Sequence, residues 1–202
     1  MDSKRVFDVN IQNQDLAARI VAGLERVAES FRVLLWDHAK ATGLSPIQIQ
    51  LLIFMHYHAE EWCNVSALAR EFNMTKPTIS DAVKVLNKKE LVRKIPSPTD
   101  GRAYNMQLTE AGEQIVQQTA EFGGPIQTIM ATFSQGEQQQ FYRTLNKLIH
   151  QLNQVGVIQI QRSCRNCRFY KSSGEGHYCG LLEMKLADDT LRLDCPEFEE
   201  KA

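Results

Sequence analysis

The stretch that decides the fold is residues 66–94, which read SALAREFNMTKPTISDAVKVLNKKELVRK. It contains two short amphipathic segments separated by a turn. Ser66 can cap a first helix, and Thr75 can cap a second helix that has Pro77 in its first turn. A helix, a short turn and another helix form a helix-turn-helix, which we predict over residues 66–90.

The second helix has one apolar and one polar face on a helical wheel. The apolar positions fall in one sector and are Ile79, Ala82, Val83 and Leu86. The positions that point away are Pro77, Ser80, Asp81, Lys84 and Lys88, with Thr78 at the flank. Short hydrogen-bonding side chains suit the base edges of DNA, and lysines suit its phosphates. The alternative is that this charged face only contacts solvent and binds no DNA.

A β-hairpin is predicted directly after this helix. Residues 92–96 and 103–108 are strand-like and flank a link that contains proline, aspartate and glycine. A hairpin at this place forms a wing over residues 92–108, with Arg93 and Lys94 on its first strand and Arg102 at its tip. Thr109 can cap the helix that follows.

Charge is unevenly distributed along a chain whose net charge is only −1. Between residues 66 and 104 there are eight Lys and Arg against four Asp and Glu. A basic segment in a mildly acidic protein is the pattern expected when one face binds a polyanion.

Two long helical stripes lie at either end of this region. The first is Leu16, Ile20, Leu24, Val27, Phe31 and Leu34 or Leu35, and the second is Phe141, Leu145, Leu148, Leu152 and Val155. Helices of this length suggest packing on each other and on a second subunit. We therefore expect a homodimer, the alternative being that both stripes close one intramolecular core. The first domain covers residues 12–158, and the fold class is mainly α.

A cysteine-rich tail, residues 164–202, is the second domain. Its cysteines are Cys164, Cys167, Cys179 and Cys195. Two cysteines separated by two residues, with two more later, are typical of a four-cysteine metal site. So short a segment also needs a metal or a cross-link to fold. We expect zinc, with iron or an iron–sulfur cluster as the alternative. The tail could be structural, sense redox state or recruit a partner.

The residues of the first domain resemble the MarR family of winged-helix bacterial transcription regulators. The resemblance covers residues 12–158 and is carried by five motifs: 65–69 (VSALA), 76–80 (KPTIS), 91–93 (LVR), 100–102 (DGR) and 108–112 (LTEAG). It implies a homodimer that places the helix-turn-helix in the major groove of double-stranded DNA and the wing in the minor groove. By position it implies that Thr75, Lys76, Pro77, Thr78, Ser80, Asp81 and Lys84 face the major groove. It likewise implies that Arg102 enters the minor groove, held by Asp100.

Two positions depart from the family pattern. Asp81 stands where members often have arginine, so the preferred operator is hard to predict. Glu90 stands where many members have glycine, and a positive φ there would be strained.

The family usually binds a small, often phenolic, effector between the dimer helices and the winged helix. Trp36, His38, His56 and Tyr57 are the candidate lining residues, although aromatic residues at this spacing are often core. We expect a sequence-specific regulator, most simply a repressor, and the alternative is a winged-helix protein-interaction module. A metalloenzyme is disfavoured because four cysteines close the coordination shell of zinc. No signal peptide or membrane span is expected, which indicates a cytoplasmic protein.

Overall fold

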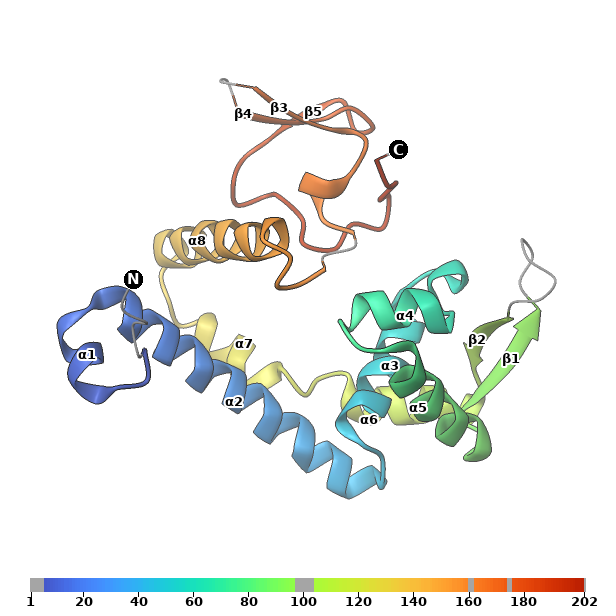
Figure 1. The fold of residues 1–202 in the computed structure, drawn as a ribbon. Helices are drawn as coiled ribbons and strands as arrows, with labels where there is room; N and C mark the ends of the chain where they lie inside the picture. The colour runs from blue at the N-terminus through green and yellow to red at the C-terminus, as the bar shows by residue number, and fades with distance from the viewer. Residues whose placement is uncertain (1–5, 97–103, 160–161, 174–175, 202) are drawn as a thin grey trace.

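A long helix leads into a winged-helix region, and a cysteine-containing module lies above them (Figure 1). The computed structural model describes residues 6–96, 104–159, 162–173 and 176–201. The helices are α1 (Val9–Gln14), α2 (Leu16–Thr42), α3 (Pro46–Tyr57), η1 (Glu60–Trp62), α4 (Val65–Glu71), α5 (Lys76–Lys88), α6 (Glu110–Thr119), α7 (Gly124–Met130), α8 (Gln135–Gln154) and η2 (Cys164–Asn166). The strands are β1 (Val92–Pro96), β2 (Tyr104–Leu108), β3 (Tyr170–Ser173), β4 (Gly176–Cys179) and β5 (Met184–Leu186).

The ends of the long helices are set by local signals in the sequence. At the start of α2 the Asp15 side chain accepts a hydrogen bond from the Ala17 N–H at 2.9 Å. The helix ends at Gly43, whose φ of 64° is the left-handed conformation expected of a C-terminal glycine. A capping box at Ser134 begins α8. The short helix α1 was not predicted, because six residues are too few to show a helical period.

The winged-helix core is built from α3, α5 and their neighbours. Its fully buried side chains include Ile49, Leu51, Leu52, Leu68, Ile79, Leu86, Val92, Met106 and Val116. The C-terminal half of α2 contributes Leu35 and Ala39 to the same cluster. This core explains why the short helices α4 and α5 are stable, since isolated helices of this length are marginal in water.

The predicted helix-turn-helix is confirmed in form, with one correction at its start. The residue that caps α4 is Asn64 and not Ser66, because the Asn64 side chain accepts the Ala67 N–H at 2.9 Å and the helix begins at Val65. Asn73 forms the turn with a φ of 51°. Thr75 caps α5 as predicted.

The hairpin is also confirmed, and its strands pair antiparallel from Val92 with Leu108 to Pro96 with Tyr104. Its tip, including Asp100 and Arg102, lies outside the described residues. After β2, Gly112 is required for packing, because a Cβ at this position would come within 2.1 Å of the Leu91 carbonyl oxygen. Thr109 caps α6 and also donates a hydrogen bond to the Glu90 carbonyl at 2.6 Å.

Glu90 has the strained backbone that the sequence suggested, with a φ of 59°. A glycine adopts this conformation without a clash between Cβ and the backbone. We expect Glu90→Gly to raise the free energy of unfolding by about 1 kcal/mol, measured by urea denaturation. Glu90→Ala, which keeps the Cβ, is the control and should give no comparable gain; equal stabilisation by both substitutions would contradict the argument.

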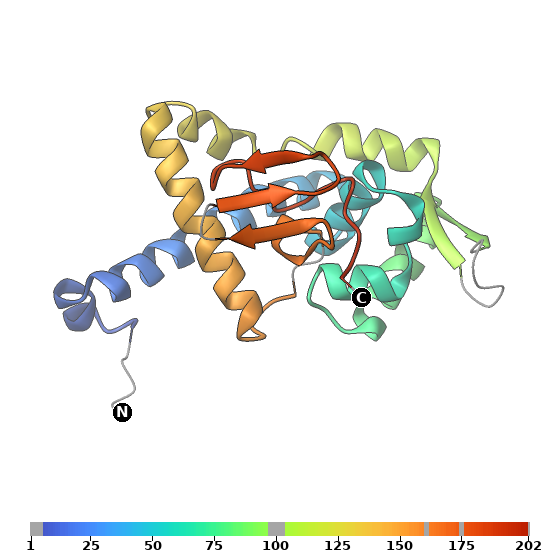
Figure 2. The same ribbon diagram turned by 90° about the horizontal axis from the view of Figure 1, so that it is seen from above.

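The cysteine-containing module is a three-stranded antiparallel sheet, ordered β3-β4-β5, with irregular segments on either side. It lies above α8 and extends toward α4, as Figures 1 and 2 show from two directions. The buried Leu191 anchors it to α8, where the Tyr142 hydroxyl and the Asn146 amide both donate hydrogen bonds to its carbonyl oxygen, at 2.5 and 3.3 Å.

Candidate nucleic-acid interface and cysteine cluster

Helix α5 buries one face and exposes the other, as the wheel predicted. Its buried residues are Ile79, Ala82, Val83 and Leu86. The exposed candidates are Thr75, Lys76, Pro77, Thr78, Asp81, Lys84 and Lys88, whereas Ser80 is half-buried. The cysteine-containing module does not cover these exposed side chains.

The beginning of α5 presents hydroxyl groups that bond to each other. The Thr75 and Thr78 hydroxyl oxygens are 2.8 Å apart, and Thr75 also accepts the Thr78 N–H at 3.3 Å. Both side chains are exposed, so each hydroxyl retains hydrogen-bonding capacity for an external partner.

The acidic residue on this face has a cationic partner. Lys84 Nζ lies 2.9 Å from Asp81 Oδ1, one turn away. The hydrogen bond from Lys84 and the charge of Asp81 raise the pKa of the lysine. Because both side chains are highly exposed, the pair is a weak one that an external anion can open. While the pair is closed, the charges of Asp81 and Lys84 cancel, so the two residues together add no net charge to the exposed face.

The described part of the wing adds two cations beside α5. Arg93 donates to the Gln107 side-chain oxygen from Nε at 2.8 Å, and Lys94 lies 4.2 Å from the centre of the Tyr104 ring. Both cations are exposed. Lys89 instead donates to the Gly43 carbonyl at 2.9 Å, which ties the end of α5 to the end of α2.

The four tail cysteines lie around one small cavity. Cys164, Cys167, Cys179 and Cys195 line a space of about 20 Å³, together with Phe169, Tyr170, Leu181, Leu182, Leu186 and Glu197. All four are free thiols. Among the described residues, neither this cluster nor any other brings three Cys, His, Asp or Glu side chains into positions that could coordinate a metal ion. The fold thus brings the four predicted ligands to one cavity, but their sulfur atoms are not arranged around a single metal position.

Hydrogen-bond donors that sequence analysis missed point at two of these sulfurs. The Arg192 N–H donates to Cys164 Sγ at 3.2 Å, and Arg192 Nη1 lies 3.4 Å from Cys195 Sγ. Burial raises the pKa of both thiols, and Arg192 acts against this shift in each case. Donors of this kind stabilise a thiolate, the form of cysteine that binds metals.

Two other residues of a type that can bind metals, His177 and Cys63, do not line the cavity. His177 contacts the Tyr170 hydroxyl at 2.6 Å and Asp188 at 2.9 Å through its two ring nitrogens, and it does not line the cysteine cavity. Cys63 is buried in the winged-helix core, where desolvation raises its pKa to about 11. It is therefore an unreactive thiol.

The residues expected to line an effector site are spread over two helices. Trp36 and Tyr57 are exposed, and His56 Nδ1 lies 2.6 Å from a Glu113 carboxylate oxygen, between α3 and α6. An effector at this place stays a prediction.

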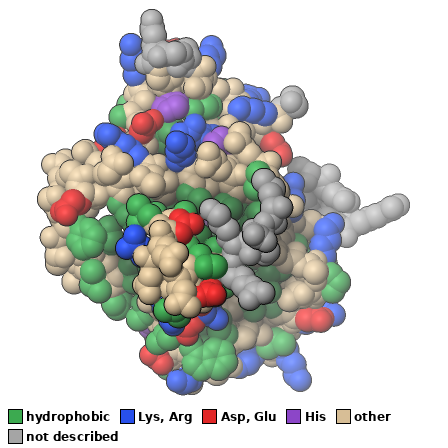
Figure 3. Space-filling model, turned by 60° about the vertical axis from the view of Figure 1, so that its left-hand side comes forward, with side chains coloured by type: hydrophobic (Ala, Val, Ile, Leu, Met, Phe, Trp, Pro, Cys, Tyr) green, Lys and Arg blue, Asp and Glu red, His purple; other side chains and the backbone are tan. Residues whose placement is uncertain are grey.

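Both long helices expose part of their apolar stripes. On α2 the exposed members are Leu16, Ile20, Val27 and Phe31, and on α8 and its end they are Phe141 and Val155. Figure 3 brings the side with α1 and the start of α2 forward and shows hydrophobic side chains gathered over it. No helix within the described ranges is long and apolar enough to cross a membrane.

The fold and the exposed face of α5 define a winged helix-turn-helix protein. Residues 42–103 match the model of the MarR family. This range covers the helix-turn-helix and strand β1 of the hairpin, so this part of the chain is similar to the MarR family. No protein with a curated description matches the chain.

Solved structures with the same fold include MepR and two proteins described as MarR regulators. The chain is 21% identical to MepR of Staphylococcus aureus in its complex with DNA, with a TM-score of 0.58, covering 65% of this chain and 97% of that one. It is 14% identical to a MarR regulator of Methanosarcina mazei Go1 (TM-score 0.57; 67% and 97% covered) and 18% identical to a MarR/EmrR regulator of Acinetobacter sp. ADP1 (0.57; 69% and 99%). Each of these three matches covers nearly the whole of the other protein but only about two thirds of this chain.

Proposed function

We propose that this protein is a sequence-specific, DNA-binding transcription regulator that uses α5 in the major groove. The observation that carries the proposal is the division of α5 into a buried apolar face and an exposed face of hydroxyls and lysines, next to the cationic base of a wing. The match to the MarR family and the fold shared with MepR, whose structure was solved with DNA, support it. On the wing tip, Asp100 and Arg102 complete the proposed contacts.

We further propose that it acts as a homodimer on a pseudo-palindromic operator. The exposed apolar side chains of α2 and α8 support a second copy as their partner, because contiguous apolar surface of this kind is unfavourable in water. The two α5 helices of such a dimer would read half-sites about one turn of DNA apart, roughly 34 Å. A dimer bound across a promoter blocks transcription, so repression is the expected mode, with an effector releasing it.

Salt dependence tests DNA binding. Lys76 is exposed at the start of α5, and a lysine that neutralises a phosphate releases a counterion. We expect Lys76→Gln to weaken binding to all duplexes and to reduce the slope of log K against log salt by about 1. Fluorescence anisotropy at several salt concentrations measures both.

Lys171→Gln is the matched control, since Lys171 is exposed on β3 in the cysteine-containing module. It should leave the affinity and the slope unchanged. A wild-type affinity that does not vary with salt would contradict the proposed function.

We propose that the chain binds a zinc ion whose ligands are Cys164, Cys167, Cys179 and Cys195. The proposal is supported by four thiol donors around one cavity and by Arg192 donors aimed at two of the sulfurs. Zinc would supply a fourfold cross-link between β-strand and loop segments that have few buried apolar side chains of their own. Metal analysis should find one zinc per chain. Visible absorption with acid-labile sulfide would instead assign an iron–sulfur cluster.

A further inference from the structure

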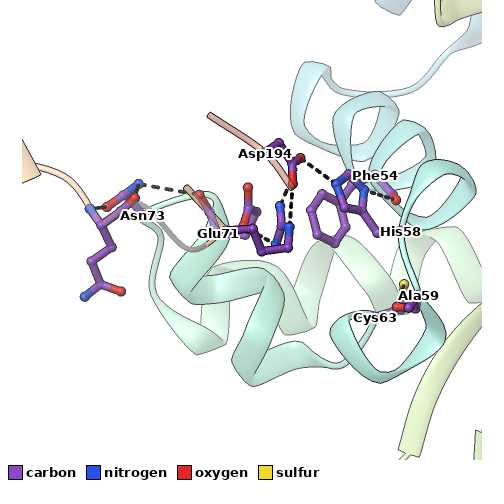
Figure 4. Close-up of polar contacts among 9 residues, drawn as sticks. Phe54, His58, Ala59, Cys63, Glu71, Asn73 and Asp194 are labelled. Carbon is purple, nitrogen blue, oxygen red and sulfur yellow. Dashed lines mark hydrogen bonds and ion pairs between the residues drawn. The ribbon is translucent and has the colours of Figure 1, made fainter. Parts of the chain in front are cut away.

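A buried arginine joins the cysteine-containing module to the helix-turn-helix. The side chain of Arg162 is only 6% exposed. Its Nη1 lies 2.9 Å from a carboxylate oxygen of Glu71, the last residue of α4, and its Nε lies 2.8 Å from Asp194 Oδ1. Figure 4 shows Asp194 between Glu71 and His58.

Four further contacts hold Arg162 and Asp194 in place. Asp194 Oδ2 lies 3.3 Å from Arg162 Nη2 and 2.7 Å from His58 Nε2, at the end of α3. The guanidinium also lies over the rings of Phe54 and Trp62, 4.9 and 5.9 Å from their centres. A buried charge is tolerated only when it is paired and hydrogen-bonded in this way.

The electrostatics of the cluster favour its charged form. Burial acts to raise the pKa of Asp194, but hydrogen bonds from His58 and Arg162 outweigh it and hold the pKa well below its usual range. Burial acts to lower the pKa of Arg162, and its bonds to Asp194 and Glu71 raise it overall.

The cluster is continuous with the backbone that carries the cysteines. Asp194 directly precedes Cys195, and the Cys195 N–H donates to the Arg162 carbonyl at 2.9 Å. The Cys164 N–H likewise donates to the Arg192 carbonyl at 3.0 Å. Arg162 and Asp194 are thus held side by side by the same two segments that bring Cys164 and Cys195 to the cavity.

The module is also attached at a second and a third place. Leu191 bonds to α8 through Tyr142 and Asn146. Asn73, in the turn between α4 and α5, accepts the Gln159 N–H at 2.6 Å on the chain that leads into the module. The module therefore connects α8, which we propose to be a dimer helix, with the helix-turn-helix.

We propose that Arg162 is a positioning residue that couples closure of the four-cysteine site to the orientation of the helix-turn-helix. With the cysteines held together, Arg162 and Asp194 stay in register and fix α4 relative to α8. Without the zinc cross-link, the segments that carry Arg162 and Asp194 are joined only by their hydrogen bonds, so the pair is held less firmly and α4 loses part of this support. Since ordering both helix-turn-helix units before DNA arrives lowers the entropic cost of binding, the closed module favours operator binding. This inference rests on the proposed DNA-binding function.

Glu71→Gln tests the coupling because it weakens the contact on α4 and leaves the Arg162–Asp194 pair in the module. The wild-type protein loaded with Zn²⁺ should bind operator DNA on the order of tenfold more tightly than the protein stripped by a chelator. In Glu71→Gln the difference should largely disappear while zinc content stays at one per chain. Glu199→Gln is the matched control: it removes the exposed pair with Arg168 inside the module and should keep the full zinc response.

Hydrogen exchange without DNA separates this inference from the proposed function. Removal of zinc should speed amide exchange in α4 of the wild-type protein, and Glu71→Gln should show fast exchange in α4 with zinc present. Arg162→Lys should restore part of the protection that Arg162→Gln loses. Exchange in α4 that is unaffected by zinc, or a zinc response of DNA affinity that survives in Glu71→Gln, would overturn the coupling. Loss of DNA binding alone, with the exchange pattern intact, would overturn only the proposed function.

Discussion

Cys167→Ser is expected to abolish zinc binding and to unfold residues 164–201, while the winged-helix core stays folded. Cys167 is buried at the cysteine cavity and supplies one of the four proposed thiolates. A structural zinc site contributes roughly 10–16 kcal/mol of apparent binding free energy, which in so small a module is folding free energy. Zinc content, limited proteolysis and hydrogen exchange of β3 to β5 measure the loss.

Cys63→Ala is the matched control for this substitution. Cys63 is also buried, but it lies in the winged-helix core and its thiol, with a pKa of about 11, stays protonated. The variant should retain one zinc per chain. In the wild-type protein a thiol reagent should modify four cysteines only after zinc is removed. A Cys167→Ser protein that keeps its zinc and its protease resistance would contradict the four-cysteine site.

Ile20→Glu is expected to convert the homodimer to a monomer. Ile20 is 53% exposed in the single chain and belongs to the apolar stripe of α2. Burial of such a side chain contributes about 1.5–3 kcal/mol per copy, and a dimer loses it twice. The introduced carboxylates would also be desolvated in the interface. Sedimentation velocity at micromolar concentration measures the change, and operator affinity should fall with it.

Val33→Glu controls for the introduced charge. Val33 has nearly the same exposure, 51%, but a 100° step per residue puts it on the opposite side of α2 from the stripe. It should leave the dimer intact. A wild-type protein that sediments as a monomer, or dimer loss in Val33→Glu but not in Ile20→Glu, would contradict an interface built on this stripe.

The features of α5 that were predicted are those that depend on neighbouring residues. Its apolar period, its Thr75 cap and the strain at Glu90 are local properties, and all three are confirmed. The cap of α4 was misplaced by two residues because Asn64 and Ser66 are both good caps, and only the backbone conformation distinguishes them. The gathering of the four cysteines was predicted from spacing, and the structure brings them to one cavity.

The sequence by itself determined the helix-turn-helix, the hairpin and the set of candidate thiol ligands, because helix periods, caps and short motifs act over a few residues. Only the tertiary structure decided where the module sits and what it touches. Arg162 bonds to Glu71 across 91 positions of sequence and to Asp194 across 32, and no local pattern specifies such partners. In the sequence Arg162 cannot be distinguished from a cation on the surface. In the folded chain it is buried, and a buried charge must be paired, so its bonds to Glu71 and Asp194 link the two parts of the chain.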